Sequence, residues 1–316
     1  MATLRASIHW LCLFPAFLSG NTTYELSSDW SEFEFVVQSK LILVEANVND
    51  LTGYFLFDTG ASELILNDYY FPPQHGIKSE DPYFDTNGLG WNYGFSFVKQ
   101  FCWNNIKREK YHTPCVPMES IEAALDVTLL GIIGQEVFKN ATLWMDYEHR
   151  KMIIGKNYES FQSFFEKPPH LQHQFEMEGH LPVLSVDIAP LEDLRLGLDS
   201  GAMMDLLSDR LERKLRHDAV AKRHFSLLGG SDQYHRSFYF IMRELETQEM
   251  FTLRFGKVGF CNLDGMRSYD IQIDGFLGVN FFRLGQVLID YQTQQIAIWA
   301  TMNDYTIRLK DRIEEK

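Results

Sequence analysis

Two short acidic motifs in this 316-residue chain carry the residue types needed for acid–base chemistry. Asp58-Thr59-Gly60 ends an apolar run, and Asp199-Ser200-Gly201 ends a similar run, so that the two aspartates are 141 positions apart (199 − 58). Two carboxyl groups about 3 Å apart cannot both ionise readily, and such a pair retains one proton over a range of pH. A carboxylate beside a carboxylic acid can take a proton from water and donate a hydrogen bond to a carbonyl group, as one route of hydrolysis requires. The two motifs are therefore candidates for one shared site.

The segments that must position these motifs are repeated along the chain. Strand patterns rich in β-branched and aromatic residues cover residues 33–37, 40–48, 54–57, 180–188 and 194–198. Each half then closes with a glycine after an apolar strand and with an Asp-Tyr pair. These landmarks stand at Gly134 and Asp146, and again 144 positions later (278 − 134) at Gly278 and Asp290. A repeat of this length indicates a duplicated domain. We expect Asp146 and Asp290 to shape the turns between the last strands.

The landmarks divide the chain into four segments. Residues 21–155 form an N-terminal lobe, residues 156–179 a linker with two prolines, and residues 180–316 a C-terminal lobe. Residues 1–20 read as a signal peptide, because Arg5 precedes a mostly apolar run and a polar stretch follows it. A buried N-terminal strand or helix is the alternative. A signal peptide implies an exported protein, periplasmic or secreted. Few helices are expected, at residues 119–125, 135–139 and 209–222 and in the tail after residue 307.

Composition excludes several classes of function. The hydrophobic fraction of 45% is enough to bury one or two cores. A net charge of −14 argues against a nucleic-acid partner, since such affinity comes from clustered lysines and arginines. The cluster at residues 210–216 reads as a solvated helix face. Beyond the first twenty residues, no stretch approaches the ~20 apolar residues of a membrane span.

Cysteines and histidines give no sign of a metal site. After the signal, Cys102, Cys115 and Cys261 remain, and an odd number rules out complete pairing. Cys102 and Cys115 could close one hairpin, or all three could be buried free thiols. No metal-ligand spacing is present among the histidines, so neither a metal nor another cofactor is expected.

The paired motifs resemble those of the aspartic proteases. Each half is similar to one retropepsin-type domain, and the chain resembles exported bacterial aspartyl proteases that carry two such domains in tandem. The likeness covers roughly residues 35 to 300 and rests on the two Asp-[Thr/Ser]-Gly-Ala strings, the later glycines and the Asp-Tyr pairs. It implies an all-β, bilobal fold with few short helices, made of two duplicated closed β-barrel-like lobes with the active site between them. It also implies a monomeric aspartic endopeptidase that hydrolyses peptide or protein substrates through water.

The resemblance gives each motif residue a role. Asp58 and Asp199 would be the catalytic dyad. Gly60 and Gly201 would let the backbone turn tightly and bring amide donors to the carboxylates. Thr59 and Ser200 would cross-link the two loops, and the strands at residues 132–134 and 276–278 would pack behind them.

Two further expectations concern pH and substrate binding. Ala61 and Ala202 stand where pepsin-like enzymes usually carry a hydroxyl residue, and losing a donor to the charged carboxylate should raise the lower pKa of the dyad. We therefore expect a mildly acidic pH optimum. Glycines and aromatics at residues 86–94 predict a clamp over the substrate, with Trp91 and Tyr93 as contacts, and residues 227–234 occupy the corresponding place in the second half. Ordinary hairpin packing is the alternative for both aromatics.

A rival interpretation belongs to a different functional class. The same scaffold could have lost turnover and bind peptides or protein partners, because a fold does not determine function. Retention of both aspartates and both glycines favours catalysis, whereas the bulky Met203 and Met204 beside the second motif leave the rival open.

Overall fold

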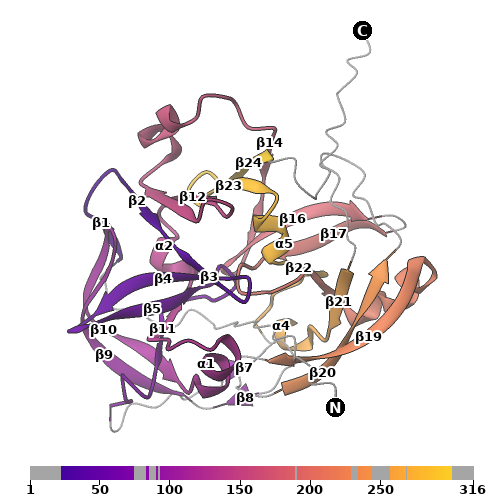
Figure 1. Ribbon diagram of the computed structural model, residues 1–316, viewed down its shortest axis with the longest axis horizontal. Coiled ribbons are helices and arrows are strands. Elements are labelled where there is room, and N and C mark those ends of the chain that lie inside the picture. Colours follow the sequence, from indigo (N-terminus) through magenta and orange to yellow (C-terminus); the bar gives the residue numbers. More distant parts are fainter. Residues whose placement is uncertain are drawn as a thin grey trace.

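The fold is mostly β, with 53% strand and 15% helix (Figure 1). The computed structural model describes residues 23–74, 83–84, 90–91, 93–188, 191–228, 234–242, 257–267 and 269–300. The expected signal peptide and the helix expected after residue 307 lie outside these residues. Below, "first half" means residues 23–155 and "second half" residues 180–300.

Eight strands of the first half form one sheet, on the left in Figure 1. Its order is β1 (Glu25–Leu26), β10 (Ile106–Val116), β6 (Ile65–Asn67), β11 (Gly131–Ile133), β5 (Leu51–Phe57), β4 (Leu41–Val48) and β3 (Val36–Gln38), with β9 (Gly94–Trp103) paired to β10 and β4. The short pair β7 (Tyr83–Phe84) and β8 (Gly90–Trp91) is separate.

A second eight-stranded sheet contains strands that follow residue 175. Its order is β15 (Glu176–Glu178), β16 (Leu181–Ile188), β17 (Leu191–Leu198), β22 (Gly275–Leu277), β18 (Leu206–Ser208), β21 (Lys257–Cys261), β20 (Tyr234–Met242) and β19 (Ala219–Leu228). The path β3-β4-β5-β11-β6-β10 recurs as β15-β16-β17-β22-β18-β21, with the same parallel or antiparallel sense at all five steps. The sequence repeat is therefore a repeat of strand topology.

A bulge explains a small mismatch between the two repeats. Leu41 and Leu181, which begin equivalent strands, are 140 positions apart (181 − 41), whereas the two aspartates are 141 apart. The extra residue falls in the β16–β17 hairpin, where the pairing register shifts between Val186 and Ile188. A bulge accepts one added residue without moving the rest of the strand, so both aspartates still follow their strands directly.

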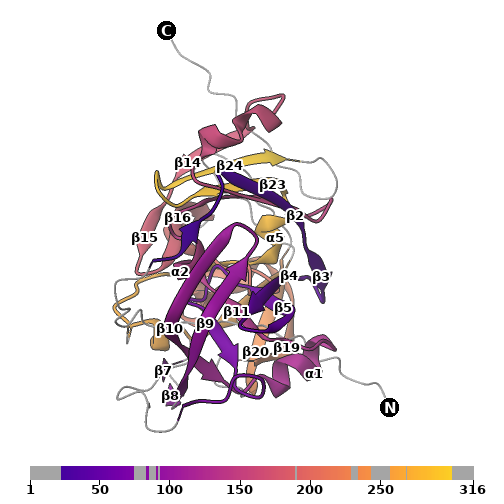
Figure 2. The same cartoon turned by 90° about the vertical axis from the view of Figure 1, so that its left-hand side faces the viewer.

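Strands from both halves build a third sheet, which lies at the top of Figure 2. Its six strands, in order, are β14 (Leu171–Gln174), β24 (Gln295–Ala300), β23 (Gly285–Asp290), β12 (Thr142–Asp146), β13 (Lys151–Gly155) and β2 (Trp30–Glu34). The central pair β12–β23 joins the halves, with Trp144 opposite Leu288. The segment expected to be the linker supplies β14, β15 and the 3₁₀ turns Tyr158–Ser160 and Gln162–Phe164.

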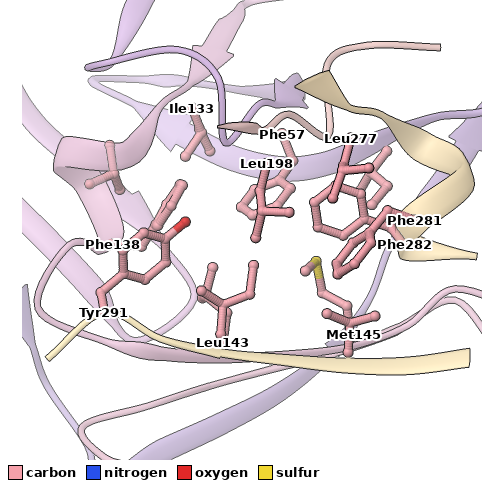
Figure 3. Close-up of a cluster of buried hydrophobic side chains, with 14 of the residues drawn as sticks. Phe57, Ile133, Phe138, Leu143, Met145, Leu198, Leu277, Phe281, Phe282 and Tyr291 are labelled. Carbon is pink, nitrogen blue, oxygen red and sulfur yellow. The ribbon is translucent and has the colours of Figure 1, made fainter. Parts of the chain in front are cut away.

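One hydrophobic cluster lies between this sheet and the motif-bearing strands (Figure 3). Phe57 and Leu198, the residues directly before the two aspartates, are both fully buried in it. Their neighbours come from both halves and include Ile133, Phe138, Leu143, Met145, Leu277, Phe281, Phe282 and Tyr291. Full burial of such side chains contributes about 1.5–3 kcal/mol each. This core therefore fixes the ends of the two strands that lead to the aspartates.

The helices of the described residues are short. They are α1 (Glu119–Leu125), α2 (Gln135–Phe138), α3 (Glu212–Leu215), α4 (Asp264–Arg267) and α5 (Val279–Phe282). The expectation at residues 119–125 is confirmed, and α2 ends one residue before the expected limit. The helix expected over residues 209–222 is wrong beyond residue 218. Helical turns, including the 3₁₀ turns Asp209–Leu211 and Arg216–Asp218, give way to β19, which pairs with β20.

Local polar contacts agree with two other expectations. Asp146 accepts a hydrogen bond from the His149 amide at 3.0 Å, and Asp290 accepts from the amides of residues 292 and 293, so both aspartates shape turns. Cys102, Cys115 and Cys261 are free thiols. Cys102 lies opposite Lys107 and Cys115 opposite Gly94 in the β9–β10 hairpin, which separates the two along the ladder. Among the described residues, no helix has the length and apolar character needed to cross a membrane.

Candidate active site

Equivalent strands hold the two acidic motifs. Asp58 follows β5 and Asp199 follows β17, and each of these strands runs parallel to a neighbour, β11 or β22. The Asp58 amide donates to the Ile133 carbonyl at 3.1 Å, and the Asp199 amide donates to the Leu277 carbonyl at 3.0 Å. Each aspartate therefore starts its turn from a fixed position at the end of a buried strand.

Within each motif, the glycine turn directs an amide at the carboxyl group. The amides of Gly60 and Ala61 donate to Oδ1 of Asp58 at 2.8 and 3.2 Å. The Gly201 amide donates to Oδ1 of Asp199 at 2.8 Å. Hydrogen bonds to a carboxylate favour its charged form and fix its orientation.

The glycines also bring the two carboxyl groups face to face across the boundary between the halves. A Cβ atom built at Gly60 would lie 2.6 Å from Cγ of Asp199, and one built at Gly201 would lie 2.5 Å from Cγ of Asp58. Real side chains do not approach so closely, so each carboxyl group occupies the space that a larger residue in the other motif would need. Glycine at both positions is a condition for the pairing.

Reciprocal hydrogen bonds between Thr59 and Ser200 lock the loops together. The Thr59 amide donates to Oγ of Ser200 at 3.0 Å, and the Ser200 amide donates to Oγ1 of Thr59 at 2.9 Å. Each hydroxyl then donates to a carbonyl in the other half, Thr59 to Leu198 and Ser200 to Phe57, both at 3.0 Å. All four groups are buried, which makes the cross-link costly to break.

Burial controls the protonation of the pair. Both carboxyl groups are 0% exposed. Burial raises the pKa of Asp58, and its hydrogen bonds oppose that rise. Burial also raises the pKa of Asp199 well above its ordinary value, and the neighbouring charge of Asp58 raises it further. The pair therefore holds one proton more readily than separate aspartates would, and its two titration steps belong to the pair as a whole.

One oxygen of each carboxyl group remains available for chemistry. Oδ2 of Asp58 and Oδ2 of Asp199 are buried and have no hydrogen-bond partner among the described residues. Ala61 and Ala202, the residues after each glycine, are fully buried and offer no hydroxyl group. Since buried carboxyl oxygens normally have a partner, these two oxygens are suited to share a proton in a hydrogen bond between the carboxyl groups or to hold a polar molecule.

The aromatic residues expected to contact a substrate are Trp91 and Tyr93, and the structure describes the side chain of Tyr93 alone of the two. Tyr93 is 8% exposed and belongs to the same hydrophobic cluster as Ala61, with its ring 5.3 Å from that of Phe95. Leu228, from the second half, is fully buried in that cluster too. Only the backbone of Trp91 in β8 is described. Tyr93 is thus packed in the hydrophobic cluster that contains Ala61 of the Asp58 loop. Leu228 of β19 packs in the same cluster, so the second half contacts the first half here.

Two residues near the site had no place in the sequence interpretation. Nε2 of His180 lies 2.8 Å from the Gly60 carbonyl oxygen and must be the donor, because a carbonyl only accepts. Burial lowers the pKa of His180 to about 4, so it is neutral in mild acid. Asp205 is buried and accepts a hydrogen bond from the Gly278 amide at 3.0 Å. A histidine at the start of a repeated strand, where the first half has Lys40, was the available signal for His180.

The described part of the chain contains no group of three or more histidine, cysteine, aspartate or glutamate residues placed to hold a metal ion. No protein-family model matches the sequence, and a comparison with curated proteins finds no significant relative.

Proposed function

We propose that this protein is an aspartic endopeptidase with a bilobal fold, in which Asp58 and Asp199 share a proton and activate a water molecule. The observation that carries the proposal is the pair of buried carboxyl groups that face each other across the two halves. Each has one oxygen fixed by glycine-turn amides and one oxygen to which no described residue donates a hydrogen bond. Positioned acids within reach of one water are what this hydrolysis requires.

The two aspartates differ in the role that each takes first. Burial raises the pKa of both aspartates, so the coupled pair keeps one proton; with that proton on Asp199, Asp58 starts as the carboxylate, and the reverse assignment is chemically equivalent. Asp58 removes a proton from water as the water oxygen attacks the peptide carbonyl carbon, and Asp199 donates its proton to the carbonyl oxygen. A tetrahedral intermediate forms. Asp58 then donates its proton to the amide nitrogen, the C–N bond breaks, and Asp199 regains a proton from the intermediate.

Preorganisation supports this chemistry. The Thr59–Ser200 cross-link holds both loops while charge moves between the carboxyl groups, and low mobility of such groups is part of their catalytic power. The alanines after each glycine leave the Oδ2 atoms without a hydroxyl donor, which disfavours ionisation of the pair. A mildly acidic pH optimum follows.

A catalytically silent scaffold that binds peptides or protein partners is the second candidate. One observation favours it: both carboxyl groups are completely buried, and the hydrophobic cluster at Ala61 includes Leu228 from the other half. An extended peptide can reach the dyad only if the groups that bury the two carboxyl groups move aside. The silent scaffold predicts binding without cleavage at every pH.

Cleavage of unstructured peptides separates the two candidates. Residues 21–316 are incubated with a mixed peptide pool between pH 3 and 7, alongside the variants Asp58→Asn, Asp199→Asn and, as a matched control, Asp50→Asn at an exposed turn. The endopeptidase predicts cleavage that both dyad variants abolish and the control retains. Binding without cleavage supports the scaffold, and cleavage that survives either dyad variant rejects the dyad.

The cellular location and the oligomeric state are part of the same proposal. The apolar N-terminal segment favours export to the periplasm or the exterior. Both motifs stand on one chain, so a monomer is sufficient for activity. The substrate would be a peptide or an unfolded protein segment.

A further inference from the structure

Asp205 is a buried carboxyl group that the dyad chemistry does not use. It stands six positions after Asp199 (205 − 199), where the first half has Leu64 six positions after Asp58 (64 − 58). The two side chains are 6% and 0% exposed. The same buried position thus holds a leucine in the first half and an aspartate in the second. Burying a carboxylate is unfavourable unless it is hydrogen-bonded.

The contacts of Asp205 lie directly behind the Asp199 loop. Its Oδ1 accepts from the Gly278 amide at 3.0 Å, and its Oδ2 accepts from Nδ2 of Asn280 at 3.0 Å. The residues on either side of Gly278 touch the loop themselves. The Leu277 carbonyl accepts from the Asp199 amide, and the Val279 amide donates to the Ala202 carbonyl at 2.7 Å. Asp205 therefore fixes the middle residue of a three-residue support.

The first half holds the equivalent support by its main chain. The Ile133 carbonyl accepts from the Asp58 amide, and the Gln135 amide donates to Ala61, as in the second half. A further backbone bond joins the Glu136 amide to the Ser62 carbonyl at 2.8 Å. Glu136, the counterpart of Asn280, directs its side chain to Arg108. In the second half, the Asp205 side chain supplies the contacts at this junction.

A charged group of the first half, Lys40, acts on Asp205. Burial raises its pKa to about 6, and its hydrogen bonds and the positive charge of Lys40, in the β3–β4 turn of the first half, oppose that rise. Burial lowers the pKa of Lys40, and the charges of Arg283 and Lys257 lower it further. Asp205 thus sits close to the boundary across which the two motifs meet.

We propose that Asp205 is a positioning residue for Asp199, holding the 277–279 support so that the Asp199 loop stays in register with the Asp58 loop. The inference rests on the proposed function. Asparagine can replace it, because its amide oxygen accepts from Gly278 and its amide nitrogen can donate to a rotated Asn280. Leucine, the residue at the equivalent place in the first half, can make neither bond.

The test compares Asp205→Asn with Asp205→Leu. We expect the asparagine variant to keep kcat within about threefold and the leucine variant to lose about 10- to 100-fold in kcat with little change in KM, the range expected when a reacting group is misplaced by up to 1 Å. Ile153→Ala, a core truncation on the six-stranded sheet, serves as a control for lost stability. Equal kcat in all three variants, or equal loss in both Asp205 variants, overturns the proposal. If Asp205→Leu does not fold, Asn280→Ala removes one contact and is expected to lower kcat by a smaller factor, and no loss there counts against the proposal.

A second measurement reads the geometry without turnover. The titration of the dyad is followed by carbon NMR of aspartate side chains in the wild type and both Asp205 variants. We expect the dyad titration to shift in Asp205→Leu and to remain in place in Asp205→Asn. An unshifted dyad in Asp205→Leu overturns the positioning role. A wild type that cleaves nothing, yet shows this pattern, rejects the proposed function and leaves the positioning role standing.

Discussion

Replacing Gly201 by alanine should separate the two carboxyl groups while leaving the backbone unstrained. The new Cβ would lie 2.5 Å from both Cγ and Oδ2 of Asp58, whereas ordinary contacts begin near 3.4 Å. Relief of that overlap requires a movement of about 1 Å in the carboxyl group or the loop. Neither Gly201 nor Gly60 has a positive φ, so alanine fits the backbone at both positions and only the clash acts.

The expected loss of activity follows from this displacement. A misplacement of about 1 Å in a reacting group can cost about 100-fold in rate. We expect Gly201→Ala, and Gly60→Ala by the same reasoning, to lower kcat by about 100-fold or more. The pair should also titrate less like a coupled dyad, because repulsion between the carboxylates falls with distance.

A matched control lies two residues before Asp199. A Cβ at Gly197 would meet its nearest neighbour, in the Phe276 ring, at 3.4 Å, which is an ordinary contact. Gly197→Ala should therefore keep kcat within about threefold. The assay is initial-rate cleavage of one peptide from the active pool, with circular dichroism to verify folding. Wild-type kcat in a folded Gly201→Ala protein would refute the facing arrangement of the two carboxyl groups.

Three further predictions concern stability. Thr59→Val leaves the Ser200 amide and the Leu198 carbonyl unpaired in a buried site, so the free energy of unfolding in urea should fall by about 2–4 kcal/mol, and an unchanged midpoint would contradict this. Phe138→Ala truncates a fully buried core residue and should cost about 3–5 kcal/mol in the same assay, so a loss below 1 kcal/mol would count against its core role. Folding raises the pKa of Asp205 from 3.8 to about 6, so its stabilising contribution is complete below pH 3.8 and is lost as the pH rises through 6. Relative to Asp205→Asn, the wild type should therefore lose up to about 3 kcal/mol of unfolding free energy between pH 4 and 7, and a difference independent of pH would argue against it.

Local patterns were enough to predict several parts of the fold. Strand ends at Asp58 and Asp199, the helix at residues 119–125 and the turns at Asp146 and Asp290 depend on neighbours a few residues away. The duplication could be predicted because equal spacing of several landmarks reflects equal strand topology. Residues 219–222 were misassigned because their pairing with β20, distant in sequence, overrode a local helical preference.

Other features depend on contacts between segments far apart in the chain. The six-stranded sheet joins β12 to β23, the His180 ring reaches the Gly60 carbonyl, and Asp205 reaches Gly278. The pattern around His180 or Asp205 marks them only when the two halves are compared, where Lys40 and Leu64 stand at the equivalent positions, since the same residue types are common in turns and on surfaces. Their contacts become visible only when the strands are in place.

The sequence by itself determined the two acidic motifs, the strands that end at them and the repeat that relates them, because these are written in short-range spacing. Only the tertiary structure decided that Oδ2 of both aspartates lies buried without a hydrogen-bond partner in the part of the chain that the structure describes, that each carboxyl group faces the other motif's glycine, and that Thr59 and Ser200 exchange hydrogen bonds. These properties arise from packing two halves against each other. The pKa values of the aspartates follow from the same packing, since desolvation and a neighbouring carboxylate exist only in the folded chain.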